Sequence, residues 1–141
     1  MSSVYIEKEI KTIDKTYSGN QSGFLSFFEG GIDLPFDIKR VYYISGVKKG
    51  GVRGFHAHKE LKQFLFCPYG SIELTLEDEN NRVVVLLNSI NKGILIDHIV
   101  WREMKWLEDD SILFVAASDY YSEDDYIRSY EDFKKLVRRK H

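Results

Sequence analysis

The stretch from Gly50 to Gly70 reads GGVRGFHAHKELKQFLFCPYG. It places two histidines, His56 and His58, one residue apart in a segment that we expect to be an extended strand. Alternate side chains of an extended chain point to the same face. Both imidazoles are therefore expected to face one space.

The spacing of glycines, histidines and Gln63 in this stretch resembles the first metal-binding motif of cupin barrels, in which the metal-binding members carry glutamate in place of Gln63. The rest of the chain consists of short apolar or alternating runs separated by Gly, Asn and Asp, a pattern typical of a sandwich or barrel. The expected strands are 4–10, 24–28, 38–45, 54–58, 61–67, 71–76, 83–87, 93–97, 101–106 and 111–117, with turns at 48–51, 68–70 and 79–81. The prediction is an all-β protein with the double-stranded β-helix, or jelly-roll, barrel of the cupins.

The C-terminal segment differs, because its apolar residues recur at helical spacing. Ser129 can cap a helix over residues 129–140, and Asp132 occupies the third helical position. The basic end of this segment suits a helix C-terminus and is interpreted as solvated. We therefore expect one domain over residues 1–141 that ends in a short helix.

The composition excludes several functions. The 141 residues carry a formal charge of −2 and include nine Tyr, nine Phe and two Trp. Acidic and basic residues are interleaved, so no basic field favours nucleic acid. The lone Cys67 lies in an apolar run and is expected to be a small buried residue. No signal peptide and no membrane-spanning run is recognised, so a cytoplasmic protein is expected.

A metal site would need donors besides the two histidines, such as a third histidine and a carboxylate. Gln63 supplies only an amide, and Arg102 stands where the third histidine of the second cupin motif would be. An arginine stays protonated and offers no free lone pair. We expect no bound metal, although His98 or Glu103 as substitute ligands would keep a metal-dependent cupin open.

The histidines could instead be inert interior groups that only complete hydrogen bonds. However, two of them on one face, with Arg53, Gln63 and Arg102 nearby, form a polar cluster that is costly to bury without a purpose. A neutral imidazole can remove a proton from carbon beside a carbonyl. The residues alone thus favour proton transfer on a keto compound.

Four motifs in order resemble the thymidine-diphosphate-sugar 3,4-ketoisomerases, and the match covers nearly the whole chain. They are Lys39-Arg40-Val41-Tyr42-Tyr43-Ile44, Arg53-Gly54-Phe55-His56-Ala57-His58, Val100-Trp101-Arg102-Glu103-Met104 and Ser118-Asp119-Tyr120-Tyr121. The resemblance implies a metal-free, cofactor-free isomerase of dTDP-4-keto-6-deoxyglucose. It also implies a homodimer in which the N-terminal strands, within residues 1–30, are exchanged, and a role in making 3-amino-3,6-dideoxy sugars for surface glycans such as O-antigen.

Carried onto this chain, the resemblance implies roles for particular residues. His58 is the expected proton-shuttling base and His56 its partner. Arg53 and Arg40 are the candidates for the diphosphate, since guanidinium groups pair well with phosphate oxygens. Gln63 is expected to hold a sugar hydroxyl or carbonyl. A non-catalytic nucleotide-sugar-binding module remains an alternative to this enzyme.

Two residues bear on the configuration at C4 of the product. Tyr17 and Arg102 resemble the glucose-forming members, whereas the galactose-forming members carry arginine and histidine in the corresponding motifs. An arginine in place of histidine removes one possible proton donor near C4. We expect dTDP-3-keto-6-deoxy-D-glucose, with the galacto epimer as the alternative.

The sequence indicates less clearly which aromatic residues belong to the site, to the core or to a surface. Tyr42 is favoured over Tyr43 for the site, because it shares a strand face with Arg40. Core or interface positions are expected for Trp101, Tyr120 and Tyr121. Surface or dimer positions are expected for Tyr126 and Arg128.

Overall fold

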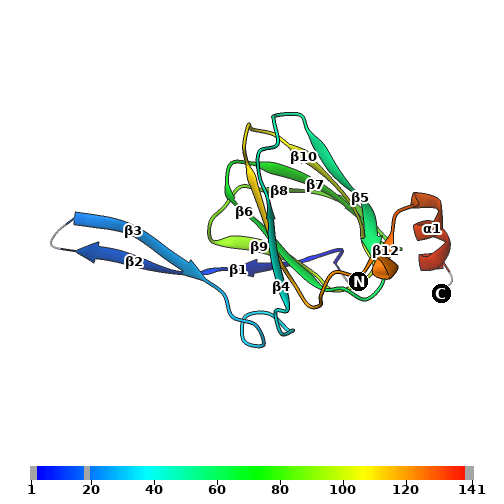
Figure 1. Cartoon of the computed structure of the whole chain (residues 1–141), viewed down its shortest axis with the longest axis horizontal. Coiled ribbons are helices and arrows are strands. Elements are labelled where there is room, and N and C mark those ends of the chain that lie inside the picture. The colour runs from blue at the N-terminus through cyan, green and yellow to red at the C-terminus, as the bar shows by residue number, and fades with distance from the viewer. Residues whose placement is uncertain (1–2, 18–19, 139–141) are drawn as a thin grey trace.

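The computed structural model is a barrel of two packed five-stranded sheets, with a separate hairpin on one side and a short helix on the other (Figure 1). It describes residues 3–17 and 20–138, without the side chains of residues 13–17 and 20–22. All paired strands are antiparallel. The predicted all-β jelly-roll class is confirmed.

The first sheet has the order β1-β9-β6-β11-β4, with bounds Ile6–Glu9, Lys92–Ile96, Gln63–Tyr69, Ile112–Ala117 and Arg40–Ile44. The second sheet has the order β12-β5-β10-β7-β8, with bounds Tyr126–Ile127, Val52–His58, Trp101–Trp106, Ile72–Glu77 and Arg82–Leu87. The hairpin consists of β2, Lys11–Tyr17, and β3, Asn20–Phe27. Each of the ten predicted strands is present, whereas β2 and β12 were not predicted.

The core lies between the two sheets, and strand β7 shows how alternating residues contribute to it. In β7, Ile72, Leu74 and Leu76 are fully buried, whereas the residues between them are partly exposed. Such alternation places one face of a strand in the core and the other toward solvent. The buried Trp106 donates its indole N–H to the carbonyl of Ser111 at 2.7 Å, so its polar atom is satisfied inside the core.

Strand β6 continues through Pro68, where a turn was predicted. The pairing of β6 with β11 shifts register here, since Ile112 faces Tyr69 whereas Phe114 faces Phe66. Such a bulge leaves one residue without a ladder bond, and a proline needs none because it lacks an N–H. Cys67 beside it is buried and unoxidised, as predicted.

The outer face of the first sheet carries a cluster of aromatic rings. Phe114 stacks on the exposed Tyr43 and contacts Phe66 and Phe28. These residues point away from the core, because Leu113 and Val115 on either side of Phe114 belong to it. Phe28 and Phe66 pack there against a second buried cluster that includes Phe64 and Ala116, and Tyr43 is left 65% exposed.

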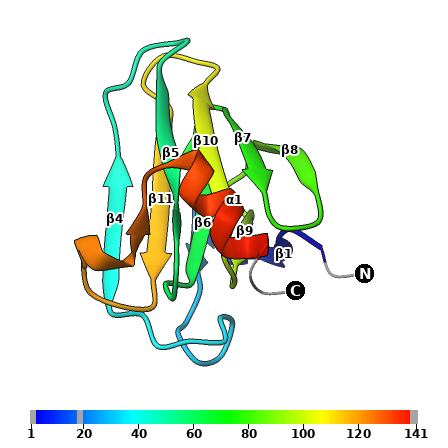
Figure 2. The ribbon, with the colours of Figure 1, turned by 90° about the vertical axis from the view of Figure 1, so that its right-hand side faces the viewer.

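Helix α1, Tyr130–Arg138, covers the outer face of the second sheet (Figures 1 and 2). Ser129 caps it, since its hydroxyl accepts the N–H of Asp132 at 3.2 Å. Phe133 and Trp101 pack in one buried cluster. Trp101 therefore lies in the core, which is one of the two positions predicted for it. No helix in the described part of the chain is long and apolar enough to cross a bilayer.

Candidate active site

The paired histidines project from the end of β5 into the barrel, as their alternation predicts. Their ring centres lie 5.0 Å apart at an angle of 85°. The ring of Tyr126 lies against both, 5.0 Å from that of His56 and 4.4 Å from that of His58. His58 is buried, with 1% of its surface exposed.

A β-bulge in β5 adds Arg53 to the same side of the strand. Arg102 faces His56 and Glu103 faces Gly54, so Phe55 is the extra residue between the two pairs. Gly54 and Phe55 both have positive φ, 96° and 58°. Strict alternation would turn Arg53 to the opposite face from His56, but the bulge resets it, and both residues line the same cavity.

Arg102 is fully buried and belongs to a hydrogen-bond chain that crosses the barrel. One terminal nitrogen donates to the side-chain carbonyl of Gln63, and the other to the carbonyl of Val100 at 3.2 Å. The amide nitrogen of Gln63 donates in turn to the hydroxyl of Tyr42 at 3.0 Å. Gln63 and Arg102, which stand where metal-binding cupins carry ligands, are thus hydrogen-bonded to each other.

This set does not fit a transition metal, because a buried guanidinium repels a cation and an amide is a weak ligand. The suggested substitutes lie elsewhere. His98 contacts Asp78 and Asp97, each at 3.0 Å, and Glu103 accepts the indole N–H of Trp101. Among the described residues, no three His, Cys, Asp or Glu side chains gather in a way that could hold an ion.

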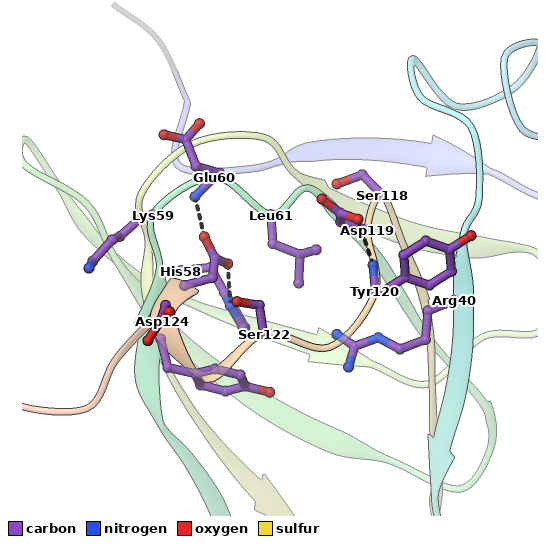
Figure 3. Close-up of a pocket in the computed structure, with 12 residues that line it drawn as sticks. Arg40, His58, Lys59, Glu60, Leu61, Ser118, Asp119, Tyr120, Ser122 and Asp124 are labelled. Atoms are coloured by element: carbon purple, nitrogen blue, oxygen red, sulfur yellow. Dashed lines mark hydrogen bonds and ion pairs between the residues drawn. The ribbon is translucent and has the colours of Figure 1, made fainter.

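Two cavities adjoin the site, and Arg40 and Tyr126 line both. One, of about 380 Å³, is also lined by Tyr42, Arg53 and His56. The other, of about 350 Å³, is reached by His58, which Figure 3 shows on the side opposite Arg40. Five of the eight residues predicted at the site therefore line these two cavities, namely Arg40, Tyr42, Arg53, His56 and His58.

Arg40 combines a buried nitrogen with aromatic contacts. Its guanidinium lies 5.2 Å from the ring centre of Tyr42 and 5.8 Å from that of Tyr121. Within the described residues, three buried nitrogens have no hydrogen-bond partner: Nε of Arg40, Nε of Arg102 and Nε2 of His58. Unsatisfied buried polar atoms are rare, so their concentration in this region indicates a polar ligand site.

Burial makes both histidines neutral near pH 7. Burial first, and then the Arg102 charge, lowers the pKa of His56 to about 4. The same two causes lower the pKa of His58 below its ordinary value, against the opposing carboxylate of Asp125 at 3.0 Å. Burial also lowers the pKa of Arg102 to about 10, which leaves it charged at neutral pH. The site therefore holds neutral bases beside a fixed cation.

The structure tests the expected positions of four other residues. Tyr126 and Arg128 were expected at the surface or the dimer contact. Tyr126 instead packs on both histidines, whereas Arg128 is exposed, as expected, with its guanidinium 4.2 Å from the centre of the Tyr126 ring. Tyr120 and Tyr121 are exposed by 68% and 59%, so neither lies in the core of this chain. Sequence patterns could not place Tyr126 at the site, because β12 is only two residues long. The pairing of β12 with β5 is what aligns Tyr126 with His58.

Tyr17 cannot be placed relative to the cluster. It ends strand β2, and its side chain lies outside the described residues.

Comparison with known proteins agrees with this geometry. Residues 7–138 match the FdtA family model, described as WxcM-like, C-terminal. The chain is 44% identical over 117 residues to TDP-4-oxo-6-deoxy-alpha-D-glucose-3,4-oxoisomerase of Aneurinibacillus thermoaerophilus, covering 83% of this chain and 84% of that protein.

Two solved structures are similar over nearly their whole lengths. QdtA, a sugar 3,4-ketoisomerase of Thermoanaerobacterium thermosaccharolyticum in complex with TDP, has a TM-score of 0.90 and 39% identity, covering 99% of this chain and 98% of that one. A histidine-to-asparagine variant of QdtA was solved with TDP-4-keto-6-deoxyglucose, and a double variant carries arginine for tyrosine and histidine for arginine. WlaRB, a TDP-quinovose 3,4-ketoisomerase of Campylobacter jejuni, has a TM-score of 0.85 and 36% identity, covering 93% of this chain and 97% of that one.

Proposed function

The chain belongs to the FdtA, WxcM-like family of TDP-sugar 3,4-ketoisomerases, and we propose that it converts dTDP-4-keto-6-deoxy-D-glucose into dTDP-3-keto-6-deoxy-D-glucose. The observation that carries this proposal is Nε2 of His58, which is buried, has no partner among the described residues and belongs to a neutral imidazole. A free imidazole lone pair in a polar cavity is suited to remove a proton from carbon.

In the proposed reaction, Nε2 of His58 takes the proton from C3 of the 4-keto sugar. The C–H electron pair forms the C3–C4 double bond, and the carbonyl electrons move to the C4 oxygen, which gives an enediolate. A proton is then delivered to C4 on the opposite face of the ring, as the gluco configuration requires, and the imidazolium of His58 releases to solvent the proton that it took from C3. The C3 hydroxyl loses its proton and becomes the carbonyl. No net oxidant is needed, because the two carbon atoms exchange oxidation states.

A proton must also move from the C3 oxygen to the C4 oxygen, and His56 is our candidate for the residue that carries it. Its ring is 5.0 Å from that of His58, and it faces the cavity that Tyr42 also lines. Gln63 and the charged Arg102 lie behind this cavity wall. Their charge and dipoles favour the negative oxygen of the enediolate.

Arg40 and Arg53 are the proposed diphosphate ligands. Both line the cavity next to His56, and Arg53 is exposed enough for its guanidinium to meet a ligand. A pair of arginines can bind phosphate oxygens in a bidentate manner. This arrangement would place the sugar, at the end of the diphosphate, between the arginines and the histidines.

The reaction is proposed to be metal-free, and one experiment tests this together with the activity. The protein is treated with EDTA, incubated with dTDP-4-keto-6-deoxyglucose in D₂O, and the sugar ring is followed by NMR. We expect a 3-keto product with deuterium at C4 and a rate that EDTA leaves unchanged. Loss of activity with EDTA would support a metal-dependent cupin, and binding without turnover would support a sugar-binding module.

The gluco configuration is proposed from Tyr17 and Arg102. The same two residue types were exchanged together in the QdtA double variant, and WlaRB is named for quinovose, which is 6-deoxyglucose. Arg102 has a pKa of about 10, so it stays charged at neutral pH and is a weaker proton donor than a protonated histidine would be. The proton at C4 is then proposed to arrive on the ring face opposite to the one from which His58 removes the C3 proton, because H3 and H4 lie on opposite faces in the gluco configuration.

The double variant Tyr17→Arg/Arg102→His is expected to shift the product from the gluco to the galacto epimer. A histidine at position 102 would provide a titratable donor inside the barrel, whereas arginine does not. The coupling of the C4 proton in the NMR spectrum distinguishes the two products. Gluco product alone from an active, folded double variant would contradict the assignment, with Arg102→Lys as the control that keeps the charge.

We also propose that the protein is a homodimer with exchanged N-terminal strands. Among the strands that the structure describes, the hairpin of β2 and β3 pairs with no other, and it projects from the barrel (Figure 1). Phe24 and Leu25 on it are about half exposed, at 56% and 47%. A second copy would cover these residues and the aromatic outer face of the first sheet.

The product suggests a place in the synthesis of 3-amino-3,6-dideoxy sugars. A ketone at C3 is the group that a PLP-dependent aminotransferase converts into an amine. The buried free thiol of Cys67 is compatible with a reducing compartment such as the cytoplasm.

A further inference from the structure

Arg128 lines the same cavity as Arg40 and Arg53, the two proposed diphosphate ligands. It directly follows strand β12, in which Ile127 is buried against helix α1. The residues on either side of Ile127 face the other way, and both Tyr126 and Arg128 line the cavity. Three arginines therefore surround one space of about 380 Å³.

The guanidinium of Arg128 is held from two sides, although the side chain is 55% exposed. Its Nε and Nη2 donate to the two carboxylate oxygens of Glu123 at 2.6 and 2.9 Å, which is a bidentate contact. Its central carbon lies 4.2 Å from the ring centre of Tyr126, a cation–π contact. Glu123 is fixed in turn, because it accepts the hydroxyl of Tyr121 at 2.6 Å. Arg128 is therefore oriented by the chain itself.

The cavity carries an excess of positive charge. Among the residues that the structure describes, no acidic side chain lines it, and neither Arg40 nor Arg53 forms an ion pair. Glu123 pairs with Arg128 from outside the lining. A cavity lined by one sign of charge attracts ions of the opposite sign. A nucleoside diphosphate sugar, with one negative charge on each phosphate, is an anion of the class that fits.

We propose that Arg128 is a third ligand for the diphosphate of the nucleotide sugar, and that Glu123 and Tyr126 hold its guanidinium in the position for binding. This inference rests on the proposed function, because the diphosphate belongs to the substrate of that reaction. The contact with Glu123 uses Nε and one hydrogen of Nη2, so Nη1 and the second hydrogen of Nη2 are left for phosphate oxygens. An arginine that is already oriented loses less conformational entropy when the ligand binds.

A purely structural role for Arg128 predicts a different result. In that role the arginine would only hold Tyr126 against the two histidines, whose rings lie 5.0 and 4.4 Å from the ring of Tyr126. Its loss would then alter the histidines, and with them kcat, without removing a contact to the nucleotide. The affinity for TDP therefore distinguishes a ligand from a brace.

The test is calorimetric titration of the wild type and of Arg128→Gln with TDP. We expect the Kd for TDP to rise by about 10-fold in the variant, the lower end for hydrogen bonds to a charged group, because Arg128 is partly exposed. The KM for dTDP-4-keto-6-deoxyglucose should rise similarly, while kcat changes little. Arg128→Lys keeps the charge without the planar fork, so its loss of affinity should be smaller than that of Arg128→Gln.

The matched control is Arg82→Gln, because the chain contains a second cluster of the same three residue types. Arg82 donates to Glu77 at 2.6 Å, and Glu77 accepts the hydroxyl of Tyr130 at 2.8 Å. Arg82 lines neither of the two cavities at the site. The control removes the same charge and the same kind of ion pair, and it should keep the wild-type Kd for TDP and the wild-type kcat. Thermal unfolding checks that both variants fold.

An unchanged Kd for TDP in Arg128→Gln would overturn the inference, whether or not kcat falls. An equal loss of affinity in Arg82→Gln would also overturn it, because the effect would then follow from the net charge and not from the cavity. If Arg128→Gln weakens TDP binding as expected but the wild type does not convert the sugar, only the proposed reaction fails.

Discussion

Replacement of His58 by asparagine is expected to lower kcat by about 10³-fold, a typical contribution of a positioned general base. The variant loses Nε2, the unpartnered nitrogen proposed to take the C3 proton. Asparagine can still donate a hydrogen bond to Asp125, so the loop after β5 should stay in place. The loss should therefore appear in kcat and in deuterium exchange at C3, and not in the binding of TDP.

The matched variant His56→Asn distinguishes the base from its partner. Because His56 is proposed only to relay the oxygen proton, C3–H exchange should survive in this variant even where product formation slows. Calorimetric titration with TDP and thermal unfolding check that both variants bind and fold. Rapid C3 exchange in His58→Asn together with none in His56→Asn would transfer the role of base to His56.

The fold could be predicted because strand patterns are local. The runs that form β6, β7 and β10 are each apolar or alternating, and turn residues separate them along the chain. Strand β2 was not predicted because its residues are mostly polar. Among the described residues it pairs with β3 alone, and this pairing aligns it.

The central part of the site could also be predicted, since two histidines at alternate positions must share a face. The position of Arg53 could not be derived by the same rule. The bulge at Phe55 reverses the alternation of side chains between the two faces of β5. Phenylalanine rarely adopts a positive φ, so the residue types do not predict this bulge. Arg53 was proposed from resemblance, and the bulge is the physical reason that it reaches the cavity.

The positions of Asp125 and Tyr126 beside His58 could not be predicted from sequence patterns. They follow a three-residue 3₁₀ helix, Glu123–Asp125, and β12 is too short to show a period. Their place beside His58 depends on pairing between segments 67 residues apart. Only the tertiary structure brings a carboxylate to the back of the imidazole.

Acidification from pH 7 to pH 5 is expected to lower the free energy of unfolding by about 2 to 4 kcal/mol, or about 1.4 kcal/mol per histidine for each pH unit below about 6.5. His56 and His58 have pKa values lowered by burial, so the unfolded chain binds protons that the folded chain refuses. Their effect is absent above the unfolded pKa and grows as the pH falls toward about 4, the folded value of His56. Asp125 opposes part of it at His58, which sets the lower figure.

Urea unfolding at pH 7 and pH 5, for the wild type and for His56→Asn, measures this dependence. In His56→Asn the free energy of unfolding should fall less steeply with decreasing pH, by up to about 1.4 kcal/mol per pH unit, because one titrating group is gone. Asp78, whose pKa is lowered below 3.8, contributes only at lower pH and should not alter this range. An equal slope in wild type and variant would mean that His56 has the same pKa in the folded and the unfolded chain, which would contradict the lowering of its pKa by burial. The acid sensitivity is therefore the thermodynamic counterpart of a neutral base at pH 7: the burial that weakens the fold in acid is also what keeps Nε2 of His58 unprotonated.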